Sequence, residues 1–115
     1  MSIDIIKTAE VIEVLENYID DIRPPENMRS KLDIAYKIDN QSVIIYEIRP
    51  RYDKPEIKIE SDIARATWIR VKGYWKIFWE KSDLKWHTYS PHPIAQTIQE
   101  FVNVVEEDKY GCFWG

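Results

Sequence analysis

The chain of 115 residues and 13.8 kDa has room for one domain, residues 1–115, because independent cores rarely form in fewer than about 50 residues. Its composition, 44% apolar and 31% charged, is typical of a soluble globular protein and excludes a disordered chain. The longest unbroken apolar run, residues 43–46, is too short to span a membrane, and the first residues lack the apolar stretch of a secretory signal. Because the single cysteine, Cys112, excludes an internal disulfide, we expect a cytoplasmic protein.

The net charge of -4 conceals an uneven distribution along the chain. Residues 1–22 carry one lysine against six carboxylates, and residues 90–115 carry one lysine against four. Residues 63–89 reverse this balance with six basic and two acidic side chains, and they contain four of the five tryptophans. An acidic protein with a basic, aromatic middle is not a general polyanion binder, but it can bind a polyanion locally.

Helices are predicted near both ends of the chain. From residue 5 to residue 22 the apolar side chains recur at helical spacing, and Arg23-Pro24-Pro25 ends this helix because proline removes a donor and restricts the residue before it. The segment Thr97-Ile98-Gln99-Glu100 has capping-box spacing, which predicts a second helix from Thr97 to about Asp108. The apolar tail that follows, residues 111–115, is expected to dock on the domain.

Strand patterns fill the middle of the chain. The expected strands are residues 32–38, 42–49, 64–71, 74–80 and 85–89. A three-residue turn at 39–41 and the hairpin signal Lys72-Gly73 connect the first four strands in pairs, and residues 49–60 are expected to form an irregular connection. This order predicts an α+β fold in which an N-terminal and a C-terminal helix pack on one face of a five-stranded, mostly antiparallel sheet.

Counting outward from the predicted turns assigns the side chains of the sheet to its two faces. The hairpin at Lys72-Gly73 pairs Arg65 with Glu80, and the next loop places Trp86 beside Trp79. The face that the helices cover then holds Ala66, Trp68, Trp75, Ile77, Trp79 and Trp86. The opposite face displays cations and rings: Arg65, Thr67, Tyr74, Lys76, Phe78, Lys85, His87 and Tyr89.

Several short segments, in order along nearly the whole chain, resemble one family. They are Arg23-Pro24-Pro25, Asp33, Tyr46-Glu47-Ile48-Arg49-Pro50-Arg51, Trp75-Lys76-Ile77-Phe78-Trp79, Leu84-Lys85-Trp86-His87-Thr88-Tyr89 and Gly111-Cys112-Phe113-Trp114-Gly115. The chain resembles the family catalogued as domain of unknown function 3024. The resemblance implies a stand-alone bacterial cytoplasmic protein, and it implies no activity and no catalytic residue. The ending Phe113-Trp114-Gly115 departs from the phenylalanine pairs common in the family but keeps their aromatic character.

The basic and aromatic face is the candidate binding site. Its proposed ligand-binding residues are Arg65, Lys76, Phe78, Lys85, His87 and Tyr89. Single-stranded nucleic acid suits such a face, because bases stack on rings at about 1 to 3 kcal/mol each while cations neutralise phosphates. The alternatives are that the rings are ordinary strand residues, or that the face contacts a protein partner or a second copy of the chain.

A polar cluster is also predicted on the first two strands, where the expected register places Asp33 beside Glu47 with Arg49 nearby. Two carboxylates and a cation resemble the pattern of divalent-metal-dependent nucleases, although arginine cannot exchange a proton as lysine can. The favoured interpretation is an ion cluster in which Arg49 neutralises both carboxylates. Enzymatic activity is therefore not predicted, although it stays open.

The remaining metal-ligating side chains do not form a recognisable site. They are His87, His92, Asp108 and Cys112. Their spacings match none of the usual zinc patterns, so we expect neither a metal site nor a cofactor.

Overall fold

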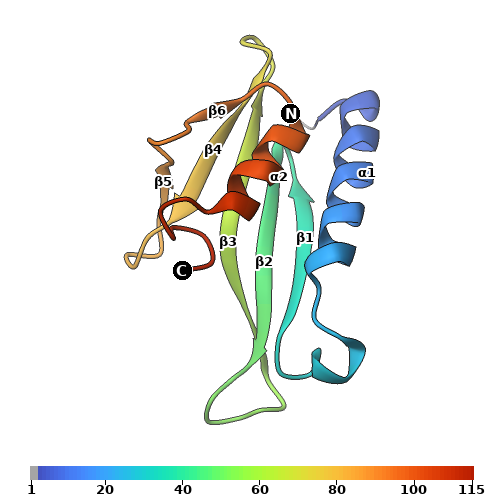
Figure 1. Cartoon of the computed structure of the whole chain (residues 1–115), viewed down its shortest axis with the longest axis vertical. Helices are drawn as coiled ribbons and strands as arrows, with labels where there is room; N and C mark the ends of the chain where they lie inside the picture. Colours follow the sequence, from blue (N-terminus) through green and yellow to red (C-terminus); the bar gives the residue numbers. More distant parts are fainter. Residues whose placement is uncertain (1–2) are drawn as a thin grey trace.

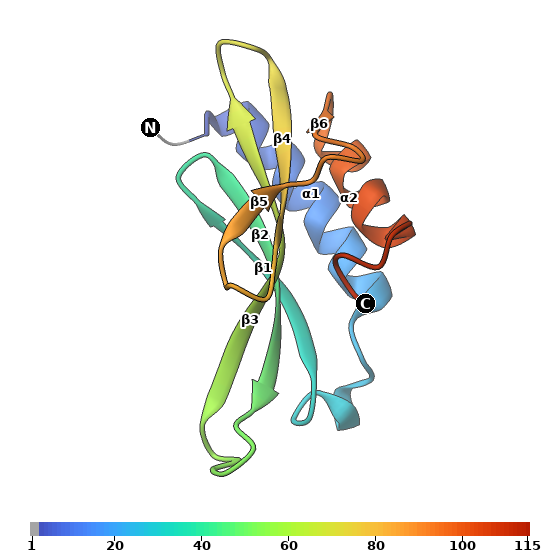
Figure 2. The ribbon, with the colours of Figure 1, turned by 90° about the vertical axis from the view of Figure 1, so that its left-hand side faces the viewer.

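The computed structural model describes residues 3–115, in which two helices pack on one face of an antiparallel sheet (Figures 1 and 2). The elements are α1 (Ile5–Ile22), the 3-10 turn η1 (Glu26–Met28), β1 (Asp33–Asp39), β2 (Ser42–Pro50), β3 (Lys58–Ile69), β4 (Tyr74–Glu80), β5 (Trp86–Thr88), β6 (Ile94–Ala95) and α2 (Ile98–Glu107). The strands β1 to β5 lie side by side in chain order, and β6 adds to the β4 edge. The predicted α+β fold is confirmed. No helix within residues 3–115 is long and apolar enough to cross a membrane.

Both helices begin directly after a capping residue. The Asp4 carboxylate accepts a hydrogen bond from the backbone N–H of Lys7 at 2.8 Å, which caps α1. Thr97 caps α2 by accepting from the N–H of Glu100 at 3.1 Å, as the capping-box spacing predicted. The helix α1 ends before Pro24, which is the stop expected from the sequence.

The hydrophobic core lies between the sheet and the two helices (Figure 2). Strands β2, β3 and β4 contribute Val43, Ile45, Ala64, Ala66, Trp75 and Ile77, all fully buried. Val11 and Leu15 of α1 and Phe101 and Val105 of α2 cover them and are fully buried as well. The alternate residues of the same strands point away from the helices, because successive side chains of a strand face opposite sides.

The connection between β2 and β3 is more regular than the sequence predicted. Instead of an irregular segment over residues 49–60, β2 continues to Pro50 and β3 begins at Lys58, so that the two strands form a long hairpin reaching beyond the helices (Figure 1). Pro50 ends its strand and Pro55 lies in the turn, so neither proline interrupts the ladder. The prolines were therefore misleading as signals of irregular structure.

All three hairpin registers predicted from loop lengths are wrong, by one residue for β1–β2 and β4–β5 and by two residues for β3–β4. The β3–β4 ladder pairs Arg65 with Phe78 rather than with Glu80, because the loop holds four residues, 70–73. This shift of two residues leaves every side chain on its predicted face. The β4–β5 ladder pairs Trp86 with Glu80, one residue from the predicted register. A one-residue shift moves side chains to the other face, so Trp86 points away from the helices.

The loop before β5 accounts for that second shift. Leu84 adopts a positive φ of 61°, and the N–H of Lys81 bonds to the carbonyl of Lys85 at 3.3 Å. The Asp83 carboxylate accepts from the N–H of Lys85 at 2.9 Å, so the loop includes Lys85 and is one residue longer than predicted. A left-handed leucine has no sequence signal, which is why the loop length was missed.

Candidate functional site

The sheet face that the helices leave uncovered is the outer face, and strand alternation assigns its side chains (Figure 2). It includes Lys37 of β1, Ser42, Ile44 and Tyr46 of β2, Glu60, Asp62, Arg65 and Thr67 of β3, Tyr74, Lys76, Phe78 and Glu80 of β4, and Trp86 and Thr88 of β5. Rings from three strands are interleaved with cations from three strands. The outer face is thus amphipathic, with both flat apolar surface and charge.

Arg65 is the centre of the outer face. Its Nε donates to the hydroxyl oxygens of Ser42 at 3.1 Å and Thr67 at 3.2 Å, and those two hydroxyls bond each other at 2.9 Å. The guanidinium carbon lies 5.8 Å from the ring centroid of Phe78 and 5.9 Å from that of Trp86. These contacts hold the Arg65 cation against two half-buried rings in a defined orientation.

A second cation, Lys37, lies over a ring in the part of the outer face that also carries acid. Its ammonium is 4.8 Å from the Tyr46 centroid, 3.5 Å from Glu60 and 3.8 Å from Asp62. Burial and the charges of Asp62 and Asp83 raise the pKa of Glu80. Carboxylates therefore concentrate on one side of Arg65, and Lys76 lies on the other side.

Three of the predicted binding residues, Arg65, Lys76 and Phe78, lie on the outer face as expected. Lys85 is exposed in the loop before β5. His87 pairs with Trp79 and therefore lies on the other face, where its Nε2 is 2.9 Å from an Asp83 oxygen. The backbone N–H of Lys85 and then His87 lower the pKa of that carboxyl. The structure therefore brings only some of the six predicted binding residues together on one face.

Tyr89 was placed on the wrong side of the sheet by the sequence. It is 2% exposed, its ring centroid is 4.8 Å from that of Phe113, and burial raises the pKa of its phenol. Trp86, predicted to be in the core, takes its place on the outer face beside Arg65. Lys37 and Tyr46 also belong to the outer face. The alternation of β1 indicates Lys37, whereas the three-residue turn expected at 39–41 placed Tyr46 on the covered face with Ile34 and Tyr36. The observed two-residue turn shows that this placement was wrong.

The predicted polar cluster does not form. The turn between β1 and β2 has two residues rather than three, with Asn40 at a φ of 54°, so Asp33 pairs with Ile48. Glu47 is opposite Ile34, and strand alternation then directs Asp33 and Glu47 to opposite faces. The carboxylate pair of the nuclease-like alternative is therefore wrong. Across residues 3–115, no group of three or more His, Cys, Asp or Glu residues could hold a metal ion.

The three residues of that cluster take part in two separate ion pairs, and only Arg49 and Glu47 remain together. The Nε and Nη2 atoms of Arg23 donate to the two Asp33 oxygens at 2.7 Å each, and these bonds lower the pKa of Asp33. Arg49 pairs with Glu47 at 3.5 Å. The bidentate Arg23–Asp33 pair ties the end of α1 to the start of β1 across the Pro24-Pro25 corner, which is a structural role.

The aromatic tail is docked, as expected. Asp108 ends α2 at a φ of 41°, and its carboxylate accepts from the N–H groups of Phe113 at 3.0 Å and Trp114 at 2.8 Å. Gly111 has a φ of 68°, and a side chain there would meet the Gly115 carbonyl carbon at 3.4 Å, so glycine suits the turn. Phe113 is buried against Tyr89 and joins the core.

The comparison with protein families matches the model of a domain of unknown function (DUF3024) to residues 3–115. The chain belongs to the DUF3024 family. Comparison with curated proteins and with solved structures finds no match. Two of the segments that carry the DUF3024 resemblance, Arg23-Pro24-Pro25 and Asp33, meet in the bidentate ion pair, and a third forms the docked tail.

Proposed function

We propose that this DUF3024 protein is a binding module that takes single-stranded nucleic acid on its outer face. The observation that carries the proposal is the position of Arg65 against Phe78 and Trp86, on a sheet face that no helix covers. Both rings are half-buried, which fixes their planes and leaves surface on which a base can stack. The exposed ammonium groups of Lys76 and Lys85 are available to phosphates beside the rings.

A protein partner, including a second copy of the chain, is the second candidate. Glu60, Asp62 and Glu80 lie on the same face and repel phosphates, whereas a protein surface can supply cations to match them. The Nε–H of Arg65 is already paired with Ser42 and Thr67, so this part of the centre of the face needs no acceptor from a ligand.

From the family resemblance we further propose a single-domain protein, residues 1–115, of the bacterial cytoplasm that works without a cofactor. A free thiol at Cys112 is compatible with a reducing compartment. Fractionation of cells that express the chain with a short epitope tag tests the location. Recovery in the cytosolic fraction is expected, and recovery in the periplasm or medium would contradict it.

Fluorescence anisotropy with a labelled single-stranded oligonucleotide tests the nucleic-acid proposal. Binding is expected at low salt and should weaken as salt rises, with a slope of about 0.7 in log-log form for each phosphate neutralised. Lys76→Ala and Phe78→Ala should both weaken it. Lys54→Ala and Tyr52→Ala are matched controls, because they remove an exposed cation and a fully exposed ring from the β2–β3 hairpin tip.

Absence of binding at low salt would reject nucleic acid as the ligand. Sedimentation equilibrium then tests the second candidate directly. A dimer that Phe78→Ala dissociates and Tyr52→Ala leaves intact would assign the outer face to self-association. A monomer at all concentrations, together with no oligonucleotide binding, would leave an external protein partner as the only proposed occupant.

A further inference from the structure

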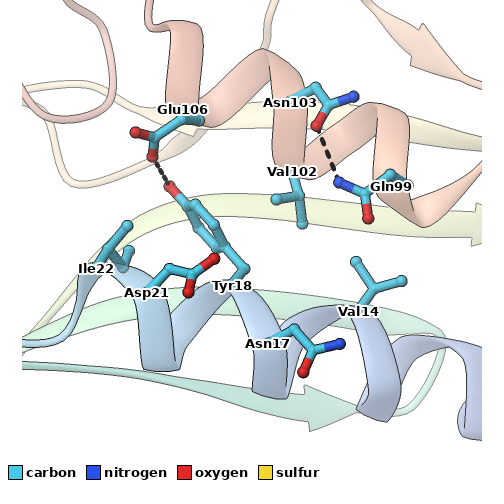
Figure 3. Close-up of a pocket in the computed structure, with 9 residues that line it drawn as sticks. All are labelled: Val14, Asn17, Tyr18, Asp21, Ile22, Gln99, Val102, Asn103 and Glu106. Atoms are coloured by element: carbon cyan, nitrogen blue, oxygen red, sulfur yellow. Dashed lines mark hydrogen bonds between the residues drawn. The ribbon is translucent and has the colours of Figure 1, made fainter.

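A groove of about 380 Å³ lies between α1 and α2, on the side of the molecule away from the outer face (Figure 3). Its polar lining consists of Asn17, Tyr18, Asp21, Gln99, Asn103 and Glu106. Val14, Ile22 and Val102 supply the apolar part. The two carboxylates lie toward one end of the groove, and Asn17 and Gln99 lie toward the other (Figure 3). The groove therefore has an acidic end and an amide-rich end.

The acidic end is organised by Tyr18. Its hydroxyl donates to the Glu106 carboxylate at 2.8 Å. Burial and the bond to Glu106 hold the pKa of Tyr18 well above its usual value, so the phenol stays protonated and keeps donating. The Glu106 carboxylate is thus fixed in orientation and has further lone pairs for another donor.

The amide end offers hydrogen-bonding groups of both kinds. The Gln99 side chain donates to the Asn103 oxygen at 2.9 Å, which orders both carboxamides along one side of the groove. Asn17 of α1 lines the groove from the opposite helix (Figure 3). Each carboxamide oxygen can accept from an ammonium group.

The charge around the groove favours a cation. The helices α1 and α2 together carry eight carboxylates and one lysine, Lys7. Lys7 is engaged elsewhere, because it pairs with Glu10 at 3.4 Å and lies 4.3 Å from the Trp68 ring centroid. None of the nine residues that line the groove is a lysine or an arginine. A ligand with ammonium groups would therefore meet an excess of carboxylates over cations on the two helices.

We propose that this groove binds an aliphatic diamine or polyamine. One ammonium group would bind the Asp21 and Glu106 carboxylates, the methylene chain would lie along Val14, Val102 and the Tyr18 ring, and a second ammonium group would bind the amide oxygens. This assignment uses the two polar ends and the apolar middle of the groove together. It does not depend on the outer face, which lies on the other side of the sheet.

Titration of the ¹⁵N-labelled full chain with 1,5-diaminopentane, at constant ionic strength, tests the proposal by NMR. Saturable shifts are expected at the backbone amides of the groove residues on both helices. 1-Aminopentane, which has one ammonium group, should bind more weakly, and sodium chloride at equal charge should not reproduce the shifts. Shifts that do not saturate, or that fall outside the two helices, would overturn the proposal.

Charge-removing variants give the second arm of the test. Asp21→Asn and Glu106→Gln should each raise the Kd for the diamine about two- to fivefold, the range of an exposed charge pair. Glu13→Gln removes an exposed carboxylate of α1 that does not line the groove, and it should leave the Kd unchanged. An equal weakening by Glu13→Gln would mean attraction to the general acidity of the helices and would refute a site. Because Glu106 also holds Tyr18, Asp21→Asn is the deciding variant if Glu106→Gln unfolds.

Discussion

The two faces of one sheet are stabilised in different ways in this molecule. On the covered face, Ala64, Ala66 and Ile77 are fully buried under two helices, and the removal of apolar surface from water supplies the stability. On the outer face, the neighbouring residues Arg65 and Thr67 form a hydrogen-bonded group with Ser42. The alternation of single residues thus separates a folding surface from a candidate binding surface.

The comparison also shows that a residue on a sheet face can be buried although no helix covers that face. Ser42 is only 3% exposed although it belongs to the outer face, because the Arg65 side chain lies across it. Long cationic side chains of this kind cover apolar surface while their charge remains in contact with water. The outer face is therefore ordered before any ligand arrives, which lowers the entropy lost on binding.

Truncation of one aromatic ring on each face of the sheet should give the largest difference in the free energy of unfolding. Trp75→Ala should lower the free energy of unfolding by about 3 to 5 kcal/mol, because it empties a fully buried position. Phe78→Ala should lower it by about 1 kcal/mol, a typical value for a substitution outside the deep core. Urea denaturation measures both. Equal losses would mean that the outer face is as buried as the core and is not a binding surface.

Tyr89, which directly follows β5, should behave as a core residue. Tyr89→Ala should destabilise the protein by about 3 kcal/mol, since the ring is buried against Phe113. Tyr89→Phe keeps the ring and should be far less destabilising, and Tyr52→Ala at the exposed hairpin tip should change stability by less than about 0.5 kcal/mol. If Tyr89→Ala reduced oligonucleotide binding without loss of stability, its assignment to the core would be wrong.

The docked tail depends on the Asp108 carboxylate. Asp108→Ala should cost about 1 to 3 kcal/mol, because the N–H groups of Phe113 and Trp114 lose their acceptor. Asp108→Asn keeps one acceptor oxygen and the tolerance of a left-handed backbone, so its loss should be smaller. Thermal unfolding monitored by tryptophan fluorescence measures both, and an unchanged melting temperature for Asp108→Ala would show that the tail adds no stability.

The Arg23–Asp33 pair should give the smallest effect on stability, and acid should abolish that effect. Arg23 lowers the pKa of Asp33 in the folded state, so the pair stabilises the protein fully above the unfolded-state pKa of about 3.9. That contribution is lost as the pH falls through the lower, folded-state pKa. Asp33→Asn should therefore lower the melting temperature slightly at pH 7 and not at all at the acid end of the profile. The same decrease at every pH would exclude a role for the Asp33 charge.

The fold could be predicted because its signals are local or periodic. The helical spacing from residue 5, the capping residue Thr97 and the stop at Pro24 predicted the helix ends, and strand alternation predicted the faces of β3 and β4. The β3–β4 faces survived an incorrect hairpin register because the shift was two residues. The face assigned to a side chain by strand periodicity is therefore still correct when the loop length is wrong by an even number of residues.

The candidate site was less predictable because it depends on loop lengths that propensity does not determine. A left-handed Leu84 lengthened one loop by one residue, which exchanged Trp86 for His87 on the outer face. A two-residue turn at Asn40 separated Asp33 from Glu47. The same shift in register turned Tyr89 to the covered face, where its N–H bonds to the carbonyl of Ile77 at 2.9 Å and its ring contacts Phe113. Each error came from a difference of one residue in the length of a turn or loop, which the local sequence does not determine.

Mapping an oligonucleotide onto the two faces tests the central claim most directly. In ¹H–¹⁵N spectra of the full chain, addition of a short single strand at low salt should shift the amides of β3, β4 and β5 around Arg65, Phe78 and Trp86, including the indole N–H of Trp86. The indole of the buried Trp75 and the amides of α1 and α2 should remain unshifted. Shifts confined to the helices, or none at low salt, would contradict the assignment of the outer face as the nucleic-acid-binding surface.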